Sequence, residues 1–121
     1  MGYYSEVAMA FTKEGHERFN VLLTAEVLKG EKNYDGETPF DLLKWAEKTE
    51  YPNDTILYHW PDVKWYHNFP SVAAIMRAFE ELEEKHYRYA RCWEEYGDSE
   101  ELGDMQGPPY LGFSSTLDVW D

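Results

Sequence analysis

The residues best placed to do chemistry are acidic and fall in one short segment. The segment EEYGDSEELGD, residues 94–104, contains six carboxylates and no Lys or Arg. These are Glu94, Glu95, Asp98, Glu100, Glu101 and Asp104. Crowded like charges destabilise a compact protein unless a partner, a cation or solvent balances them. We therefore predict that these six residues form a partner-binding surface, with a solvated turn as the simpler alternative.

Carboxylates spaced along a rigid edge have a charge pattern similar to that of nucleic-acid phosphates. An edge of this kind is steered into a groove lined by Lys and Arg and displaces counterions there. The predicted partner is thus a basic surface on a protein that handles nucleic acid. The acids at 80–84 extend this surface if the fold brings the two runs together. Calcium binding is less well supported, because the segment lacks the D-x-D-x-D-G spacing of an EF-hand loop.

No other residues form a recognised catalytic or metal-binding pattern. The four histidines are scattered without H-x-x-x-H spacing. His59 and His67 could meet across a predicted hairpin, but surface or hydrogen-bonded histidines are the better explanation. Cys92 lies in mid-strand, where a small buried hydrophobe is the usual role of a free cysteine. Almost any two of the 24 acids could be paired for glycoside chemistry, so such a pair has no specificity. We expect no catalytic residue, no metal and no cofactor, and hence a protein that is not an enzyme.

Aromatic residues are abundant and raise a second hypothesis. In a single-strand-binding protein, a sheet face with this many rings would stack bases, but here the accompanying cations are missing. Arg88 and Arg91 should lie on opposite faces of their strand. Core packing together with a protein interface explains the rings better, so a self-associating structural protein, a homodimer through an aromatic sheet face, is the main alternative. A small ligand-binding domain or enzyme is the next. The aromatic residues concerned are Tyr58, Trp60, Trp65, Tyr66, Tyr87, Tyr89 and Trp93.

Composition limits the class of protein. The 121 residues correspond to a single domain, residues 1–121. The formal charge of −13 argues against direct binding to DNA, RNA or an anionic membrane, and residues 80–121 carry −9 of it. One cysteine cannot form an internal disulfide, and no apolar run approaches the ~20 residues that cross a bilayer. We expect a cytoplasmic protein.

Local patterns predict alternating strands and helices. Thr12 and Gly30 mark the ends of one helix, Pro39 begins a short helix, and Pro70 begins a third helix. Pro61 and Asp62 suit the centre of a type I turn and therefore predict a hairpin. Residues 96–109 are expected to be irregular. The expected elements are a central strand over 3–11, helices over 13–29 and 40–48, hairpin strands over 55–60 and 63–67, a helix from residue 70 to 82, and strands over 86–95 and 110–120.

This order predicts an α+β fold. The sequence β-α-α-β-β-α-β with an added C-terminal strand corresponds to the ferredoxin-like split β-α-β sandwich. In that arrangement an antiparallel sheet carries its helices on one face.

Two segments resemble a known group of proteins. The run HYRYARCWEEYGDSEELG at 86–103, preceded by KWYHNF at 64–69, is similar to small conserved proteins of unknown function from bacteriophages and prophages. The resemblance implies a phage accessory protein in the host cytoplasm and makes inhibition of a host system a reasonable hypothesis. It implies no catalytic residue.

Overall fold

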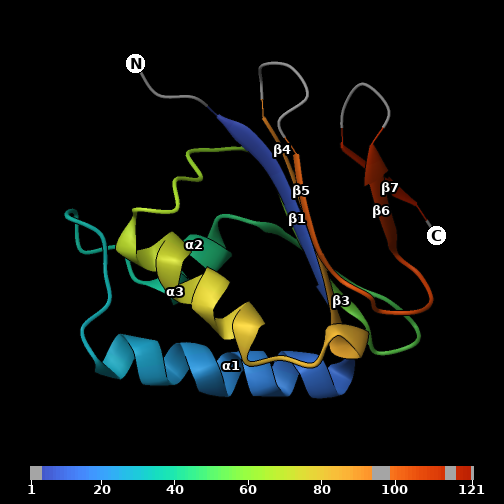
Figure 1. Cartoon of the computed structure of the whole chain (residues 1–121), viewed down its shortest axis with the longest axis horizontal. Coiled ribbons are helices and arrows are strands. Elements are labelled where there is room, and N and C mark those ends of the chain that lie inside the picture. The colour runs from blue at the N-terminus through green and yellow to red at the C-terminus, as the bar shows by residue number, and fades with distance from the viewer. Residues whose placement is uncertain (1–3, 94–98, 114–116, 121) are drawn as a thin grey trace.

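The structure, a computed structural model, describes residues 4–93, 99–113 and 117–120. It is a mixed α+β fold in which a five-stranded antiparallel sheet has the order β2-β3-β1-β4-β5 (Figure 1). A separate two-stranded sheet is formed by β6 and β7. The elements are β1 (Ser5–Phe11), α1 (Lys13–Leu28), α2 (Pro39–Lys44), β2 (Glu47–Glu50), β3 (Ile56–Val63), α3 (Pro70–Glu80), η1 (Glu84–His86), β4 (Tyr87–Trp93), β5 (Ser99–Gly103), β6 (Tyr110–Phe113) and β7 (Leu117–Trp120).

Strand β1 is central, as predicted, and it is buried on both faces. Its odd-numbered residues Val7, Met9 and Phe11 face the helices, whereas Ala8 and Ala10 face the opposite side, and all five are inaccessible to solvent. The strand therefore has no solvent-exposed side over these five residues. Small alanines on the second face allow another layer to pack closely against it.

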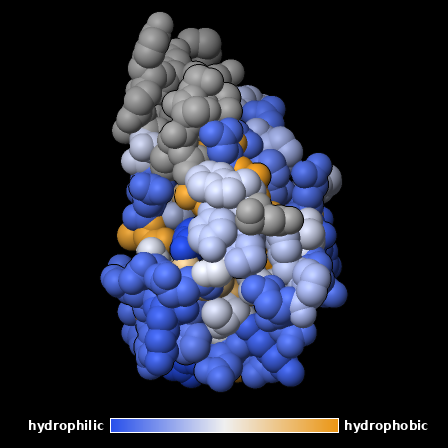
Figure 2. All heavy atoms as spheres, turned by 90° about the vertical axis from the view of Figure 1, so that its right-hand side faces the viewer, coloured by the Kyte–Doolittle hydropathy of each residue, from blue (hydrophilic) through white to orange (hydrophobic). Residues whose placement is uncertain are grey.

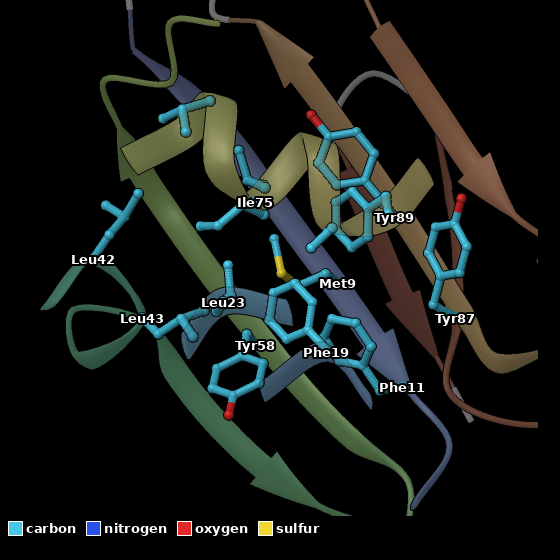
Figure 3. Packing of buried hydrophobic residues seen from close by; sticks show 14 of the residues in the cluster. Met9, Phe11, Phe19, Leu23, Leu42, Leu43, Tyr58, Ile75, Tyr87 and Tyr89 are labelled. Atoms are coloured by element: carbon cyan, nitrogen blue, oxygen red, sulfur yellow. The ribbon is translucent and has the colours of Figure 1, made fainter. Parts of the chain in front are cut away.

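The larger core lies between the sheet and the three helices, which share one side of the sheet (Figure 1). Side chains from β1, α1, α2, α3, β3 and β4 converge there (Figure 3). Phe11 stacks on Phe19 at 4.4 Å between ring centroids, and Phe79 stacks on Tyr87 at 4.9 Å. Such aromatic pairs add about 0.5–1.5 kcal/mol beyond the burial of their area.

The C-terminal hairpin covers the opposite face of the sheet. Leu111 of β6 and Leu117 of β7 pack with Met105 against Ala8 and Ala90. The hairpin thus forms a third layer (Figure 1). The sequence predicted one long strand over 110–120, but β6 and β7 pair with each other instead of joining the main sheet.

The predicted hairpin centred on Pro61 and Asp62 is wrong, because both residues lie inside strand β3. The register between β1 and β3 shifts at this point, so that Ser5 faces Val63 and Val7 faces Trp60. A bulge tolerates proline, since the ladder hydrogen bond that proline cannot donate is not needed there. The partner of β3 in its hairpin is β2, whose first two residues, Glu47 and Lys48, fall within the helix predicted over 40–48.

The segment expected to be irregular contains the fifth strand. Residues 99–103 pair with β4 in antiparallel register, with Glu100 opposite Arg91 and Leu102 opposite Tyr89. The acidic segment is thus partly a sheet edge rather than a loop.

Candidate functional site

Half of the predicted partner-binding residues lie within the structure described. Glu94, Glu95 and Asp98 lie outside the described residues. Glu100 and Glu101 are neighbours in β5 and point to opposite faces of the sheet, and Asp104 follows the strand. The prediction that the six act as one uncompensated surface is wrong for Glu100, whose environment differs from that of the other two.

Glu100 is held by three side chains from the same side of the sheet. Its Oε1 atom accepts hydrogen bonds from Arg91 Nε at 2.7 Å and Tyr89 Oη at 2.9 Å, and it lies 3.0 Å from His67 Nε2. Burial would raise the pKa of the Glu100 carboxyl, but the bonds from Arg91 and Tyr89 outweigh it and the pKa lies below its ordinary value. Burial and the neighbouring carboxylate raise the pKa of the Tyr89 phenol. Glu100 therefore neutralises a buried arginine and is a structural residue.

Glu101 and Asp104 instead join a second acidic run. The backbone N–H of Asp104 donates to the Glu84 carbonyl oxygen at 2.7 Å, so the end of β5 is fixed beside η1. Glu84 and Glu101 line the same shallow hollow of about 370 Å³. Together they belong to a group of exposed carboxylates that we call the acidic face: Glu80, Glu81, Glu83, Glu84, Glu101 and Asp104.

Basic side chains near the acidic face are already engaged. Lys85 Nζ lies 3.3 Å from the Glu83 carboxylate, and both side chains are exposed. Arg88 donates to the carbonyl oxygens of Pro109 and Met105, and its guanidinium lies over the Tyr110 ring. Both side chains keep their positive charge, and Arg88 lines the same hollow as Glu84 and Glu101, so the six carboxylates of the acidic face lie beside two cations, Lys85 and Arg88.

The histidines do not assemble a metal site among the residues described. His59 Nε2 lies 2.8 Å from Glu6 and His67 bonds Glu100, so the predicted meeting of His59 and His67 does not occur. No group of three His, Cys, Asp or Glu side chains in the described part of the chain could hold a metal ion. Cys92 is half-buried and packs against the cluster under the C-terminal hairpin, as a small hydrophobe would.

The aromatic residues proposed as an exposed sheet face form the core instead. Tyr58, Trp60, Trp65, Tyr87 and Tyr89 are at most 7% exposed and all belong to the helix-side cluster. Five of the seven rings named in the sequence analysis are therefore not available as an exposed sheet face, and self-association stays a prediction.

A groove at the other end of α3 has no counterpart in the sequence predictions. It has a volume of about 670 Å³ and is formed by the segment after α1, the C-terminal end of α2, the end of β3 and the start of α3. Trp45 at its rim is 75% exposed, and Trp60 in its wall is buried and donates its indole N–H to the Leu42 carbonyl. The sequence signal that could have indicated this groove is a tyrosine, Tyr34, in the segment between α1 and α2, followed by a tryptophan, Trp45, at the end of α2.

Carboxylates give the groove a negative rim. Burial raises the pKa of Glu37, and the charge of Asp35 raises it further, while hydrogen bonds from Asn33 and Trp45 act in the opposite direction. Asn33 Nδ2 lies 3.2 Å from Glu37 Oε1. Asp62 is also on the rim, and Lys64 Nζ sits 5.6 Å from the Tyr4 ring centroid. The acids outnumber the single lysine of the lining.

Comparisons of the chain with protein-family models, with curated proteins and with solved structures found no match. Within the part of the chain that the structure describes, none of the helices has the length and apolar character needed to span a membrane.

Proposed function

We propose that this protein is a non-enzymatic binding module whose acidic face engages a basic surface on a protein that handles nucleic acid. The observation that carries the proposal is the bond between the Asp104 amide and the Glu84 carbonyl, because it joins two acidic runs that are separate in the sequence. Of the six residues predicted from the sequence, Glu101 and Asp104 are retained in this site. Glu94, Glu95 and Asp98 remain predicted members, and Glu100 is not one.

Electrostatics supports this choice of partner. A surface of one sign raises the association rate with a partner of opposite sign and suppresses encounters with partners of like sign. A net charge of −13 gives the whole molecule the same preference. Binding should therefore weaken as salt screens the exposed carboxylates.

The remaining parts of the hypothesis follow from the sequence. The resemblance of residues 64–69 and 86–103 to small phage and prophage proteins favours a phage accessory role in the host cytoplasm, with a host protein as the partner. A ferredoxin-like relationship is supported by the order β1-α1-β2-β3-α3-β4; α2, the fifth sheet strand β5 and the separate β6–β7 hairpin depart from the predicted arrangement with one added C-terminal strand. The scaffold alone implies no activity, since such folds host many functions.

Strand addition is disfavoured as a route to self-association. The sheet has β2 at one edge, with the sequence EKTE, and β5 at the other, with the sequence SEELG. Charged residues on edge strands oppose pairing with a second copy. Figure 2 shows that this side of the molecule is mostly blue, with a pale area of intermediate hydropathy at its centre and small hydrophobic areas; Tyr110 and Trp120 of the β6–β7 hairpin are 37% and 50% exposed. A protein partner recognised through charge suits this surface better than an apolar dimer contact.

The test is a pull-down from host lysate with two matched variants, each of which removes four charges. The face variant carries Glu81→Gln, Glu84→Gln, Glu101→Gln and Asp104→Asn. The control variant carries Glu17→Gln, Glu47→Gln, Glu50→Gln and Asp54→Asn, all at exposed positions elsewhere. A prey protein that the face variant loses and the control variant keeps would support the proposal.

A third variant addresses the acids outside the described residues. It replaces Glu94 and Glu95 with Gln and Asp98 with Asn, and Glu100 is left intact in every variant because its loss would disturb Arg91. Equal retention of the prey by the wild type and by both the face variant and this third variant would refute the acidic-surface hypothesis.

A further inference from the structure

The groove beside Trp45 lies at the opposite end of α3 from the acidic face. Pro70, the first residue of α3, lines the groove, whereas Glu80 at the last turn of the same helix belongs to the acidic face. The two sites therefore use different residues and can be altered independently. A volume of about 670 Å³ is within the range that holds small ligands.

The walls of the groove are unusually rich in exposed aromatic surface. Tyr34 is fully exposed and Trp45 is 75% exposed, although tryptophan is normally well buried. The inner wall is formed by Trp60 and Phe69. The indole N–H of Trp60 is already used by the Leu42 carbonyl, so it is not available to a ligand, and the accessible aromatic surface is that of Tyr34 and Trp45. Exposed aromatic surface next to a concave wall is typical of a binding site.

The charge of the groove selects the ligand. Asp35, Glu37 and Asp62 line it, and the only basic residue in its lining is Lys64, which is placed over the Tyr4 ring. Neighbouring carboxylates repel one another when both are ionised, and a positive group between or beside them offsets this repulsion. Aromatic faces also attract cations through their quadrupoles. Both features disfavour anionic ligands.

The groove wall is fixed before any ligand arrives. Asn33 Oδ1 accepts a hydrogen bond of 3.0 Å from the backbone N–H of Ser71. This bond satisfies one of the free N–H donors in the first turn of α3. Ser71 Oγ donates to the Glu37 carbonyl at 2.6 Å, and the Asn33 N–H donates to the same oxygen at 2.8 Å. The segment after α1 is thus tied to the start of α3 (Figure 1). Preorganisation of this kind reduces the entropy lost on binding.

We propose that this groove binds an organic cation, an ammonium or guanidinium group carried on an apolar body. The aromatic surfaces of Trp45 and Tyr34 contact the cation and its apolar body, and Asp35 and Glu37 supply the opposite charge. The cation belongs either to a free small amine or to a Lys or Arg side chain of a peptide, and the chemistry of recognition is the same for both.

The experiment is an NMR titration of the ¹⁵N-labelled full chain with choline and with 3,3-dimethyl-1-butanol, the neutral molecule of the same shape. Choline should shift the Trp45 indole signal and the amides of residues 33–37, and it should bind about tenfold more tightly than the neutral analogue. A parallel titration with an acetylated, amidated Gly-Arg-Gly peptide identifies the source. Tighter binding of the peptide assigns the cation to a protein segment, and tighter binding of choline assigns it to a free amine.

Matched variants complete the test. Asp35→Asn with Glu37→Gln keeps the acceptor oxygens, and Trp45→Ala removes an exposed ring; each should weaken choline binding by about tenfold. Glu80→Gln and Leu28→Ala change exposed residues elsewhere and should leave it unchanged. Equal affinity for choline and its neutral analogue, shifts confined to other residues, or full binding by the groove variants would overturn the proposal. The face variant should still bind choline, so failure of one hypothesis does not imply failure of the other.

Discussion

At the scale of single residues, Glu100 shows how a structure redistributes roles within one charged segment. The six acids look equivalent in the sequence. In the structure, the Glu100 carboxylate accepts hydrogen bonds from Arg91 and Tyr89, whereas Glu101 points to the other face of the sheet. Arg91 is only 6% exposed, and a buried guanidinium needs a carboxylate close by. The pair is therefore a requirement of the fold, and neutralising all six acids together would confuse loss of binding with loss of stability.

The prediction is that Glu100→Gln destabilises the protein by about 1–3 kcal/mol, because a charge-assisted bond to a buried arginine is lost. Glu101→Gln, one residue away and exposed, should change stability by less than about 0.5 kcal/mol. Urea unfolding followed by tryptophan fluorescence measures both. Equal effects of the two substitutions would mean that the Arg91–Glu100 bond contributes nothing.

Residue-level chemistry was only partly predictable from the sequence. Alternation in the strand predicted over 86–95 correctly placed Arg88 and Arg91 on opposite faces, since Arg91 bonds Glu100 beside Tyr89 whereas Arg88 reaches the carbonyl of Pro109. It could not reveal the carboxylate opposite Arg91, because the register between two strands depends on pairing rather than on local pattern. The groove was missed for a similar reason. Its walls come from segments far apart in the chain, and only tertiary folding brings them together.

At the scale of elements, the start of α1 is tied to η1. The Thr12 N–H donates to the His86 carbonyl at 3.0 Å, and Thr12 Oγ1 accepts from the Gly15 N–H as the N-cap of the helix. A Cβ atom at Gly15 would lie 2.3 Å from the His86 carbonyl oxygen. Gly15 is therefore required by this close approach, even though glycine weakens a helix.

We expect Gly15→Ala to destabilise the protein by about 1–3 kcal/mol, because the clash is with backbone and cannot be relieved by a rotamer change. In an open helix the same substitution would stabilise by up to about 1 kcal/mol. The sign of the change is thus the test. Glu17→Ala, exposed on the same helix, serves as the control and should be close to neutral. A stabilising Gly15→Ala would show that α1 and η1 are not in contact.

Helices α1 and α3 are joined by an ion pair with a predictable pH dependence. Arg77 donates to Glu26 through Nε at 3.0 Å and Nη2 at 2.9 Å. These hydrogen bonds hold the pKa of the Glu26 carboxyl below its ordinary value of 4.5. A depressed folded-state pKa stabilises the protein above the unfolded-state pKa, and this stabilisation is lost as the pH falls through the folded-state value.

Replacement of Arg77 by Met should therefore lower the free energy of unfolding at neutral pH by about 1–3 kcal/mol and reduce its decline below pH 4.5. Arg18→Met, at an exposed position of α1, should leave both quantities unchanged. Urea denaturation across an acidic pH series provides the comparison. Parallel pH curves for the wild type and Arg77→Met would contradict a role for the pair.

The predicted starts of the helices agree with the structure where a capping residue marks them, and other predicted element ends do not. Thr12 and Thr38 do cap α1 and α2, and Pro70 does begin α3. The strand β2 escaped prediction because its four residues are all exposed and show no alternation. Pro61 suggested a turn because local propensity cannot predict a bulge. The bulge arises from the pairing of β3 with β1, and proline is tolerated there.

At the scale of the whole molecule, the sheet is covered on both faces and its negative charge is spread over the exterior. The helices bury one face and the β6–β7 hairpin buries the other, so stability comes from two apolar clusters. The charge of −13 opposes this compaction through self-repulsion. The acidic face, where Glu80, Glu81, Glu83 and Glu84 follow one another along the chain, is thus expected to lower stability in the absence of a partner.

Two consequences of this balance are measurable together. Sodium chloride should raise the melting temperature of the wild type, because it screens repulsion between exposed carboxylates within about 10 Å of one another at 0.1 M. The face variant, with four of these charges removed, should be more stable than the wild type at low salt by up to about 1 kcal/mol and should respond less to added salt. The control variant with Glu17, Glu47, Glu50 and Asp54 neutralised loses as much charge, but Glu47 lies near His59 and Glu50 near Lys48, so it should gain less stability. A face variant less stable than the wild type at low salt would show that these carboxylates stabilise the fold. The acidic face would then not be a surface that lowers stability in the absence of a partner.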